Sequence, residues 1–173
     1  MDRKYFFVLV LVCVSTHIIR TVYEIFKHNK ILEPSKFSFI VIFANMAVLW
    51  ISWFMLCGLD KNRVDIPVIA KYTGLLLILT GVIIFFTGLF TIKTLESYDG
   101  DLITNGIYSK LRHPMYSAFI LWLLEAPLFF GVLLPFLFSI ALIANVLFWR
   151  YLEEKELEIR FPDYSEYKKK TLF

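Results

Sequence analysis

Five apolar runs constrain the fold of this chain more than any other feature. They cover residues 5–26, 37–59, 66–92, 114–130 and 132–151. A helix needs about 20 apolar residues to cross the hydrocarbon core of a bilayer, and it satisfies its backbone hydrogen bonds internally. The sequence therefore predicts an all-α, polytopic membrane protein with five transmembrane helices.

Composition supports this class and excludes others. The 173 residues have 18% aromatic side chains and a mean hydropathy of +0.67, far above the values of soluble proteins. The net charge is only +3, and the basic residues are scattered between apolar runs, which argues against a nucleic-acid partner. Cys13 and Cys57 both lie inside apolar runs, so we expect neither a disulfide framework nor a metal site.

The last two apolar runs and the first one each allow a specific structural prediction. Gly131 alone separates the last two runs, which predicts a tight helical hairpin. The first run follows a short basic start, as a secretory signal does, but the following "STHIIR" is a poor cleavage site for signal peptidase. We therefore expect the first run to be a retained membrane span.

The distribution of basic residues predicts the orientation. Thirteen Lys and Arg residues lie on segments that would share a side with the C-terminus, against five on the other side. By the positive-inside rule the N-terminus is outside and the C-terminus cytoplasmic. Residues 1–92 would form three N-terminal helices. Residues 93–173 would add a loop, the helical hairpin and a tail within one structural domain, with loop 93–113 and tail 150–173 facing the same compartment.

A Thr-Gly pair occurs three times in the third run, at residues 73–74, 80–81 and 87–88. Seven residues advance an ideal helix by about two turns, so the three glycines would lie on one face. Small residues on one face let a neighbouring helix approach closely. We interpret the repeat as a packing seam.

Several charged groups fall within the predicted spans. His17, Arg20 and Glu24 would share a face of the first helix, where Arg20 and Glu24 could form an ion pair. Glu125 lies within the fourth run, where a carboxylate needs a partner or a proton. It could contact a substrate headgroup or hydrogen-bond across the bundle, and the sequence favours neither.

The strongest functional pattern begins with "NGIYSKLRHPMY", residues 105–116. Pro114 suits the first turn of a helix, where its missing N–H has no intrahelical partner. That turn presents free backbone N–H groups and the positive end of the helix dipole, which attract a carboxylate or phosphate. Arg112 and His113 lie beside it.

A second polar segment, "RYLEEKELEIRFPDYSEYKKK", follows the last run at residues 150–170. It carries Glu153 and Glu154 in its first aqueous turn, and then the aromatic residues Phe161, Tyr164 and Tyr167. The hairpin would return these groups to the level of Arg112 and His113. Such a set suits a ligand with both charges and a ring, whereas "KKK" at 168–170 is typical of contact with lipid phosphates.

At these residues the sequence resembles the isoprenylcysteine carboxyl methyltransferase and phospholipid methyltransferase group of integral membrane enzymes. The resemblance rests on "GIY" at 106–108, "RHPMY" at 112–116, "EE" at 153–154 and the aromatic series, over roughly the last 75 residues. It implies a five-helix bundle that holds S-adenosylmethionine at its cytoplasmic face, while the lipid tail of the substrate enters from the bilayer.

The resemblance also implies site residues. Arg112, His113 and Glu154 would be catalytic. The cofactor would be bound by Leu102, Ile103, Gly106, Tyr108, His113, Tyr116, Glu153, Glu154, Tyr164 and Tyr167. The tyrosines could contact the sulfonium through cation–π interactions. The partners would be membrane lipid and a lipophilic or prenylated substrate, and the compact size suggests a prokaryotic inner membrane.

Methyl transfer to a prenylcysteine carboxylate requires no general base, because that acceptor is already ionised at neutral pH. The protein would then align the reactants and exclude water. A phospholipid amine would be an alternative acceptor, and it would need His113 or a carboxylate as base. A non-catalytic membrane subunit that binds lipid headgroups is the alternative outside the enzymes. The sequence leaves the acceptor and the oligomeric state open.

Overall fold

The computed structural model describes residues 3–92 and 101–173. The predicted all-α class is confirmed, because the described residues form helices and no β-strand. In chain order these are α1 (Arg3–His28), α2 (Lys36–Leu59), α3 (Val68–Ile92), the short 3-10 helix η1 (Gly106–Ser109), α4 (Pro114–Phe130), α5 (Leu133–Arg160) and α6 (Tyr164–Lys170).

Four of the helices, α1, α2, α3 and α5, are long and apolar enough to cross a membrane. The fifth predicted span, α4, is a shorter apolar helix of 17 residues. At a rise of 1.5 Å per residue α4 extends about 25 Å, somewhat less than the hydrocarbon core. Pro114 at its first turn and the left-handed Gly131 at its end set these limits. The prediction of a multi-pass membrane protein is confirmed, with four spans identified by length and composition.

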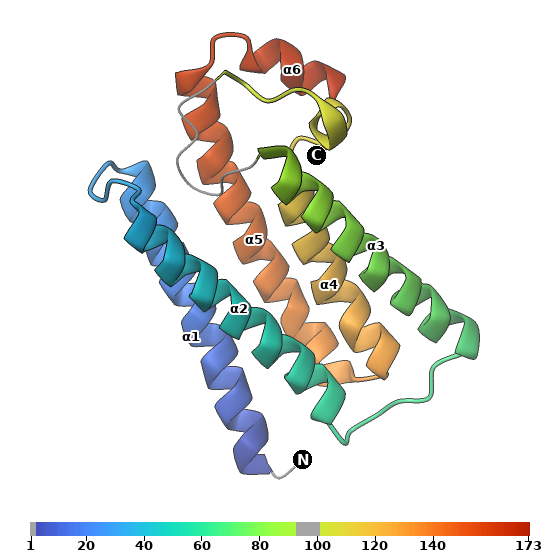
Figure 1. Ribbon diagram of the computed structural model, residues 1–173. Helices are drawn as coiled ribbons and strands as arrows, with labels where there is room; N and C mark the ends of the chain where they lie inside the picture. Colours follow the sequence, from blue (N-terminus) through green and yellow to red (C-terminus); the bar gives the residue numbers. More distant parts are fainter. Residues whose placement is uncertain (1–2, 93–100) are drawn as a thin grey trace.

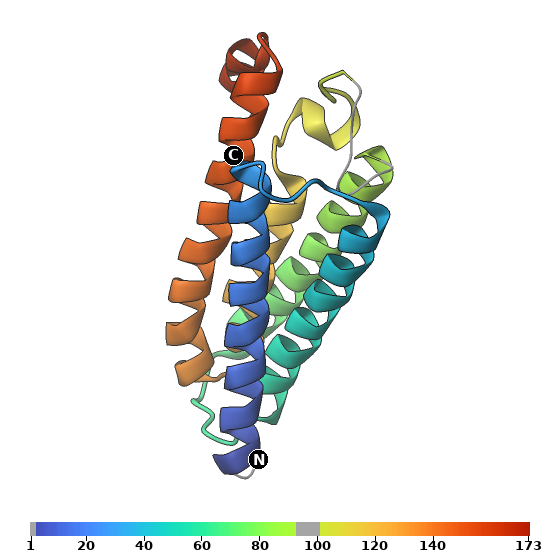
Figure 2. The same cartoon turned by 90° about the vertical axis from the view of Figure 1, so that its left-hand side faces the viewer.

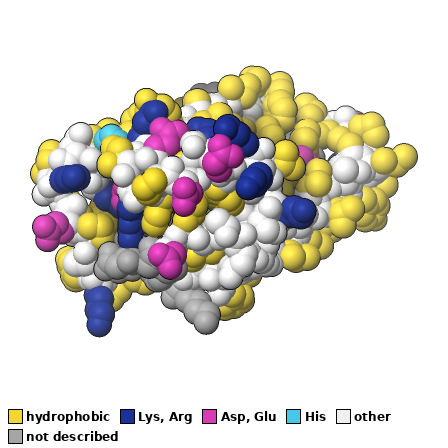
Figure 3. All heavy atoms as spheres, turned by 90° about the horizontal axis from the view of Figure 1, so that it is seen from above, with side chains coloured by type: hydrophobic (Ala, Val, Ile, Leu, Met, Phe, Trp, Pro, Cys, Tyr) yellow, Lys and Arg dark blue, Asp and Glu magenta, His cyan; other side chains and the backbone are white. Residues whose placement is uncertain are grey.

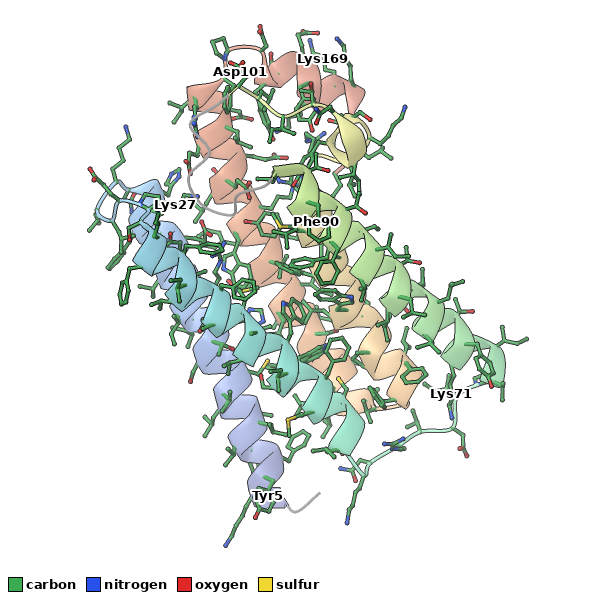
Figure 4. The ribbon with its side chains drawn as sticks, viewed as in Figure 1. Tyr5, Lys27, Lys71, Phe90, Asp101 and Lys169 are labelled. Carbon is green, nitrogen blue, oxygen red and sulfur yellow. The ribbon has the colours of Figure 1, made fainter. Side chains whose placement is uncertain are left out.

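The long helices lie side by side, and α6 packs across one end of them (Figures 1 and 2). We call this the α6 end. Lys, Arg, Asp and Glu side chains gather there (Figure 3). Lys27, Asp101 and Lys169 lie at the α6 end, whereas Tyr5 and Lys71 lie at the opposite end (Figure 4). The orientation across the membrane stays a prediction, and Lys93, one of the basic residues counted for it, lies outside the described residues.

The turn between α4 and α5 places the two polar segments together. Gly131 has a φ of 69°, a left-handed conformation that glycine adopts without steric cost. Its N–H donates to the Leu128 carbonyl, the next N–H donates to the Pro127 carbonyl, and α5 begins at Leu133. The predicted tight hairpin is confirmed, so the start of α4 lies beside the end of α5.

The three glycines of the Thr-Gly repeat form the contact between α3 and α4. Gly74, Gly81 and Gly88 are all buried in α3. A Cβ on Gly81 would lie 2.7 Å from Trp122 Nε1, and one on Gly88 would lie 2.9 Å from Pro114 Cγ. The predicted packing seam is confirmed, and its last glycine supports the first residue of α4.

We expect Gly81→Ala and Gly88→Ala to lower stability, because each added methyl group would force α3 and α4 apart. Overpacking of this kind costs about 1–3 kcal/mol. Gly74→Ala is the matched control, since its Cβ would meet its nearest neighbours at 3.4 Å. Thermal unfolding of the three variants in detergent is the measurement. Equal melting temperatures would contradict close packing at the seam.

Polar side chains inside the bundle join α1 to α5. The Asn145 amide nitrogen lies 3.0 Å from His17 Nδ1, and the Thr21 hydroxyl donates to the Asn145 carbonyl oxygen at 2.9 Å. The Trp149 indole N–H donates to Thr21, and its ring stacks on His17 with centroids 5.1 Å apart. These contacts fix the face that α1 turns toward α5.

The backbone carbonyl of Glu125 lies at the seam beside Gly74.

Candidate active site

The two polar segments predicted to meet lie in contact at the α6 end. His113 Nε2 lies 3.2 Å from Glu154 Oε1, and Arg112 Nη2 lies 3.4 Å from the same oxygen. Both contacts join the residues just before α4 to the last part of α5. The predicted proximity of "RHP" and "EE" is therefore confirmed.

Glu154 is the centre of an ionic network. Its side chain is buried, and Arg150 also donates to Oε1, with N···O distances of 3.2 and 3.3 Å. Lys168 of α6 donates to Oε2 at 2.9 Å, and this hydrogen bond raises the pKa of Lys168. One carboxylate thus binds cations from three segments and holds α6 against α5.

Arg112 fixes the chain beyond α6. Its Nη1 donates to the carbonyl oxygens of Lys168 at 3.0 Å and Thr171 at 2.7 Å. Its backbone N–H donates to the Leu172 carbonyl, and the Leu172 N–H donates to the Lys110 carbonyl. Residues 171–173 therefore lie along the segment before α4 and close this side of the site.

A cavity, which we call the polar cavity, lies beside this network. It is bounded by the end of α1, the segment before α4, the end of α5, and α6. Its lining residues are Arg20, Glu24, Lys27, Ile92, Leu102, Ile103, Tyr108, Arg112, Met115, Tyr116, Glu153, Glu156, Leu157, Arg160, Phe161, Tyr164 and Tyr167.

Most residues predicted to bind the cofactor line the polar cavity. They are Leu102, Ile103, Tyr108, Tyr116, Glu153, Tyr164 and Tyr167, and Arg112 joins them from the predicted catalytic set. The structure places the other predicted residues, Gly106, His113 and Glu154, outside this lining. His113 and Glu154 contact each other outside the lining, where they join the segment before α4 to α5.

The two adjacent glutamates occupy different environments. Successive residues of a helix differ by about 100° in direction, so Glu153 and Glu154 cannot face the same side of α5. Glu153 lines the polar cavity together with Tyr116. Glu154 faces the cations of the ionic network instead.

Gly106 shapes the site through the backbone. It has a φ of 56°, and a Cβ there would lie 3.3 Å from the Thr91 side chain of α3. The short helix η1 that begins at Gly106 brings Tyr108 to the polar cavity, where the Tyr167 hydroxyl donates to the Tyr108 carbonyl at 2.6 Å.

The tyrosines of the polar cavity remain neutral at physiological pH. Burial raises the pKa of Tyr167 to about 12, partly opposed by Arg112. Burial likewise raises the pKa of Tyr108 and of Tyr164. Their rings can therefore face a cation without themselves carrying charge.

The first helix contributes a wall of the polar cavity that sequence reasoning missed. Arg20 and Glu24 form the expected ion pair, but both also line the cavity. Lys27 lines it too and lies 3.5 Å from Glu156 of α5. These three residues are spaced four and then three apart, which places them on one helical face. This spacing is the sequence feature from which a polar wall on α1 could have been predicted.

The lining suits a ligand that carries both charges and an aromatic ring. Cations and carboxylates face the same space, with tyrosine rings between them. Within residues 3–92 and 101–173, the Tyr108 hydroxyl and Arg112 Nε are buried without a hydrogen-bond partner. Buried polar atoms without partners are uncommon in folded proteins, and a polar ligand would satisfy them.

An apolar pocket adjoins the polar cavity. It lies between α2, α3 and α4, and its volume of about 390 Å³ is within the usual range for small-molecule sites. Its lining residues are Arg20, Phe39, Ile42, Phe43, Met46, Ala47, Trp50, Phe54, Val82, Phe85, Met115, Tyr116, Phe119 and Trp122. Arg20, Met115 and Tyr116 line both spaces, so we call these three residues the junction.

Comparison with known proteins identifies the family. The sequence profile of a family described as phospholipid methyltransferase matches residues 69–163, which is more than half of the chain. The chain belongs to the phospholipid methyltransferase family. No curated protein and no solved structure matches the chain. Family membership makes this protein a membrane methyltransferase, as the sequence motifs indicated, and the matched region contains α4, α5 and much of the polar cavity.

Proposed function

We propose that the protein transfers a methyl group from S-adenosylmethionine to a small lipophilic acceptor, most similar to the carboxylate of a prenylated cysteine. One observation carries the proposal: the polar cavity and the apolar pocket meet at the junction. A charged cofactor and a lipophilic acceptor can therefore approach each other from opposite sides.

The polar cavity would hold the cofactor. The backbone near Leu102 and Ile103 would lie against it, and Glu153 would bind its ammonium group. Arg112 would face its carboxylate, and the neutral tyrosine rings would face the sulfonium. His113 and Glu154 would act by holding Arg112 and α6 in place.

The apolar pocket would hold the tail of the acceptor. Its walls are mostly aromatic, and rings such as those of Trp50, Phe119 and Trp122 pack with centroids 4.9–5.9 Å apart. A tail in this pocket would place its headgroup at the junction. The helices around the pocket would face the bilayer, from which such an acceptor would enter.

We also propose the arrangement in the membrane. All five apolar helices, including the shorter α4, would cross the bilayer. The N-terminus would be outside and the α6 end cytoplasmic, as the basic residues predict. A prokaryotic inner membrane would suit the compact chain.

When bound, S-adenosylmethionine supplies an electrophilic methyl group, which an ionised carboxylate takes up by displacing the thioether, with no proton exchanged. The residues of the two cavities contribute alignment and a dry environment. Met115 and Tyr116 would exclude water where the reactants meet. No general base is needed for this acceptor.

A phospholipid amine is the second candidate acceptor. The family description names phospholipids, and the carboxylates of Glu24 and Glu153 line the polar cavity. An ammonium acceptor must lose a proton before it can accept a methyl group, so one of these carboxylates would serve as base.

The pH dependence of turnover separates the two acceptors. With a carboxylate acceptor we expect a rate that is nearly constant from pH 6 to pH 8.5, because the acceptor is ionised throughout. With an amine acceptor the rate should rise with pH as the ammonium loses its proton. The measurement is transfer of a labelled methyl group to N-acetyl-S-farnesylcysteine and to phosphatidylethanolamine in detergent. Transfer to neither acceptor by protein that binds the cofactor would contradict both assignments.

A further inference from the structure

We infer that Arg20 binds the headgroup of the acceptor and selects an anionic one. This inference rests on the proposed function and names the residue that sets its substrate class. Arg20 belongs to α1, outside the region that matches the family profile.

Arg20 lies where the two cavities meet. The junction consists of Arg20, Met115 and Tyr116, and Arg20 is its charged member. A headgroup whose tail lies in the apolar pocket must reach the polar cavity past these side chains. The guanidinium is therefore placed where the reacting group of the acceptor would lie.

Its surroundings fix the guanidinium in place. Arg20 forms an ion pair with Glu24, whose side chain is only 5% exposed. The guanidinium carbon lies 5.6 Å from the centre of the Tyr23 ring and 6.0 Å from that of Trp149. Trp149 is itself held by its hydrogen bond to Thr21. A cation held in this way is positioned before a ligand arrives, which lowers the cost of binding.

The chemistry of the guanidinium favours a carboxylate. It has five N–H donors in a planar fork, a geometry that binds a carboxylate through two parallel hydrogen bonds. An ammonium headgroup at the junction would meet a cation of the same sign. It could approach Glu24 only by competing with Arg20, and like-charge contact in a partly buried site is costly.

The test uses Arg20→Gln together with Glu24→Gln, because removal of Arg20 alone would leave a buried carboxylate without its partner. The probes are N-acetyl-S-farnesylcysteine, which is anionic, and its neutral primary amide as a competitive inhibitor. In the wild type we expect the carboxylate to bind at least tenfold more tightly than the amide. In the double variant the KM for the carboxylate should rise at least tenfold while the affinity for the amide and for S-adenosylmethionine stays within about twofold.

Two further variants complete the design. Arg20→Lys keeps the charge but loses the planar fork, and we expect an intermediate KM. Lys36→Gln removes an exposed cation from the start of α2 that lines neither cavity, and it should behave as the wild type. A KM for the carboxylate that is unchanged in the double variant overturns the inference. A loss confined to S-adenosylmethionine binding also overturns it, since Arg20 would then belong to the cofactor. Wild-type protein that binds no S-adenosylmethionine would remove the proposed function as well.

Discussion

Replacing Glu154 with alanine is expected to lower the melting temperature more than any other single change at the α6 end. Glu154 is 7% exposed, and its carboxylate is shared by Arg112, Arg150 and Lys168. Its loss leaves three cations close together without their common anion. Breaking a buried ionic contact typically costs about 3–5 kcal/mol.

Glu158→Ala is the matched control, because Glu158 lies one turn further along α5 and also binds Lys168. Its ion pairs are solvent-exposed, and such pairs contribute little to stability. Thermal unfolding in detergent, followed by intrinsic fluorescence, measures both variants. If Glu154→Ala melts at the same temperature as Glu158→Ala, Glu154 does not hold α6 and the segment before α4 together.

Replacing the neighbouring Glu153 with glutamine is expected to have the largest effect on cofactor affinity. Glu153 lines the polar cavity, and glutamine keeps its size while removing its charge. Loss of a hydrogen bond between charged groups costs about 1.5–3 kcal/mol, which corresponds to a roughly ten- to hundredfold weaker Kd. We expect little change in melting temperature, in contrast to Glu154→Ala.

The readout for Glu153→Gln is the Kd for S-adenosylmethionine by calorimetry, beside Glu158→Gln as a charge-matched control. The control should retain wild-type affinity, since Glu158 is outside the polar cavity. Wild-type affinity in Glu153→Gln would show that this carboxylate does not bind the cofactor. The division of roles between the two adjacent glutamates would then be wrong.

The sequence predicted the features that depend on local pattern. The lengths of the apolar runs predicted the long helices, and Gly131 between two apolar runs predicted the hairpin. The hairpin in turn predicted that His113 and Glu154 would meet. The three glycines of the Thr-Gly repeat predicted the seam, because a spacing of seven residues places them on one face of the helix.

Features that depend on how helices face one another could not be predicted. The spacing of Arg20, Glu24 and Lys27 places them on one face of α1, but the sequence gives no reason why that face should turn toward α5. That choice is made by contacts such as the hydrogen bond between Thr21 and Asn145. The rotation of α5, which separates the roles of Glu153 and Glu154, is likewise set by packing.

The length of α4 is a second such feature. The apolar run at 114–130 predicts a span, but the length of the helix is limited by Pro114 and Gly131. The contacts of α4 with the glycines of α3 then hold it in the bundle. Its short length places His113 at the level of Glu154, where the ionic network forms.

The proposed function requires that the polar cavity bind S-adenosylmethionine. Calorimetric titration of the detergent-purified protein with S-adenosylmethionine and S-adenosylhomocysteine tests it most directly. We expect saturable binding of both at one site per chain, at least tenfold weaker in Glu153→Gln. Folded wild-type protein that binds neither compound would contradict it, and the α6 end would then be a lipid-headgroup surface on a membrane protein without this chemistry.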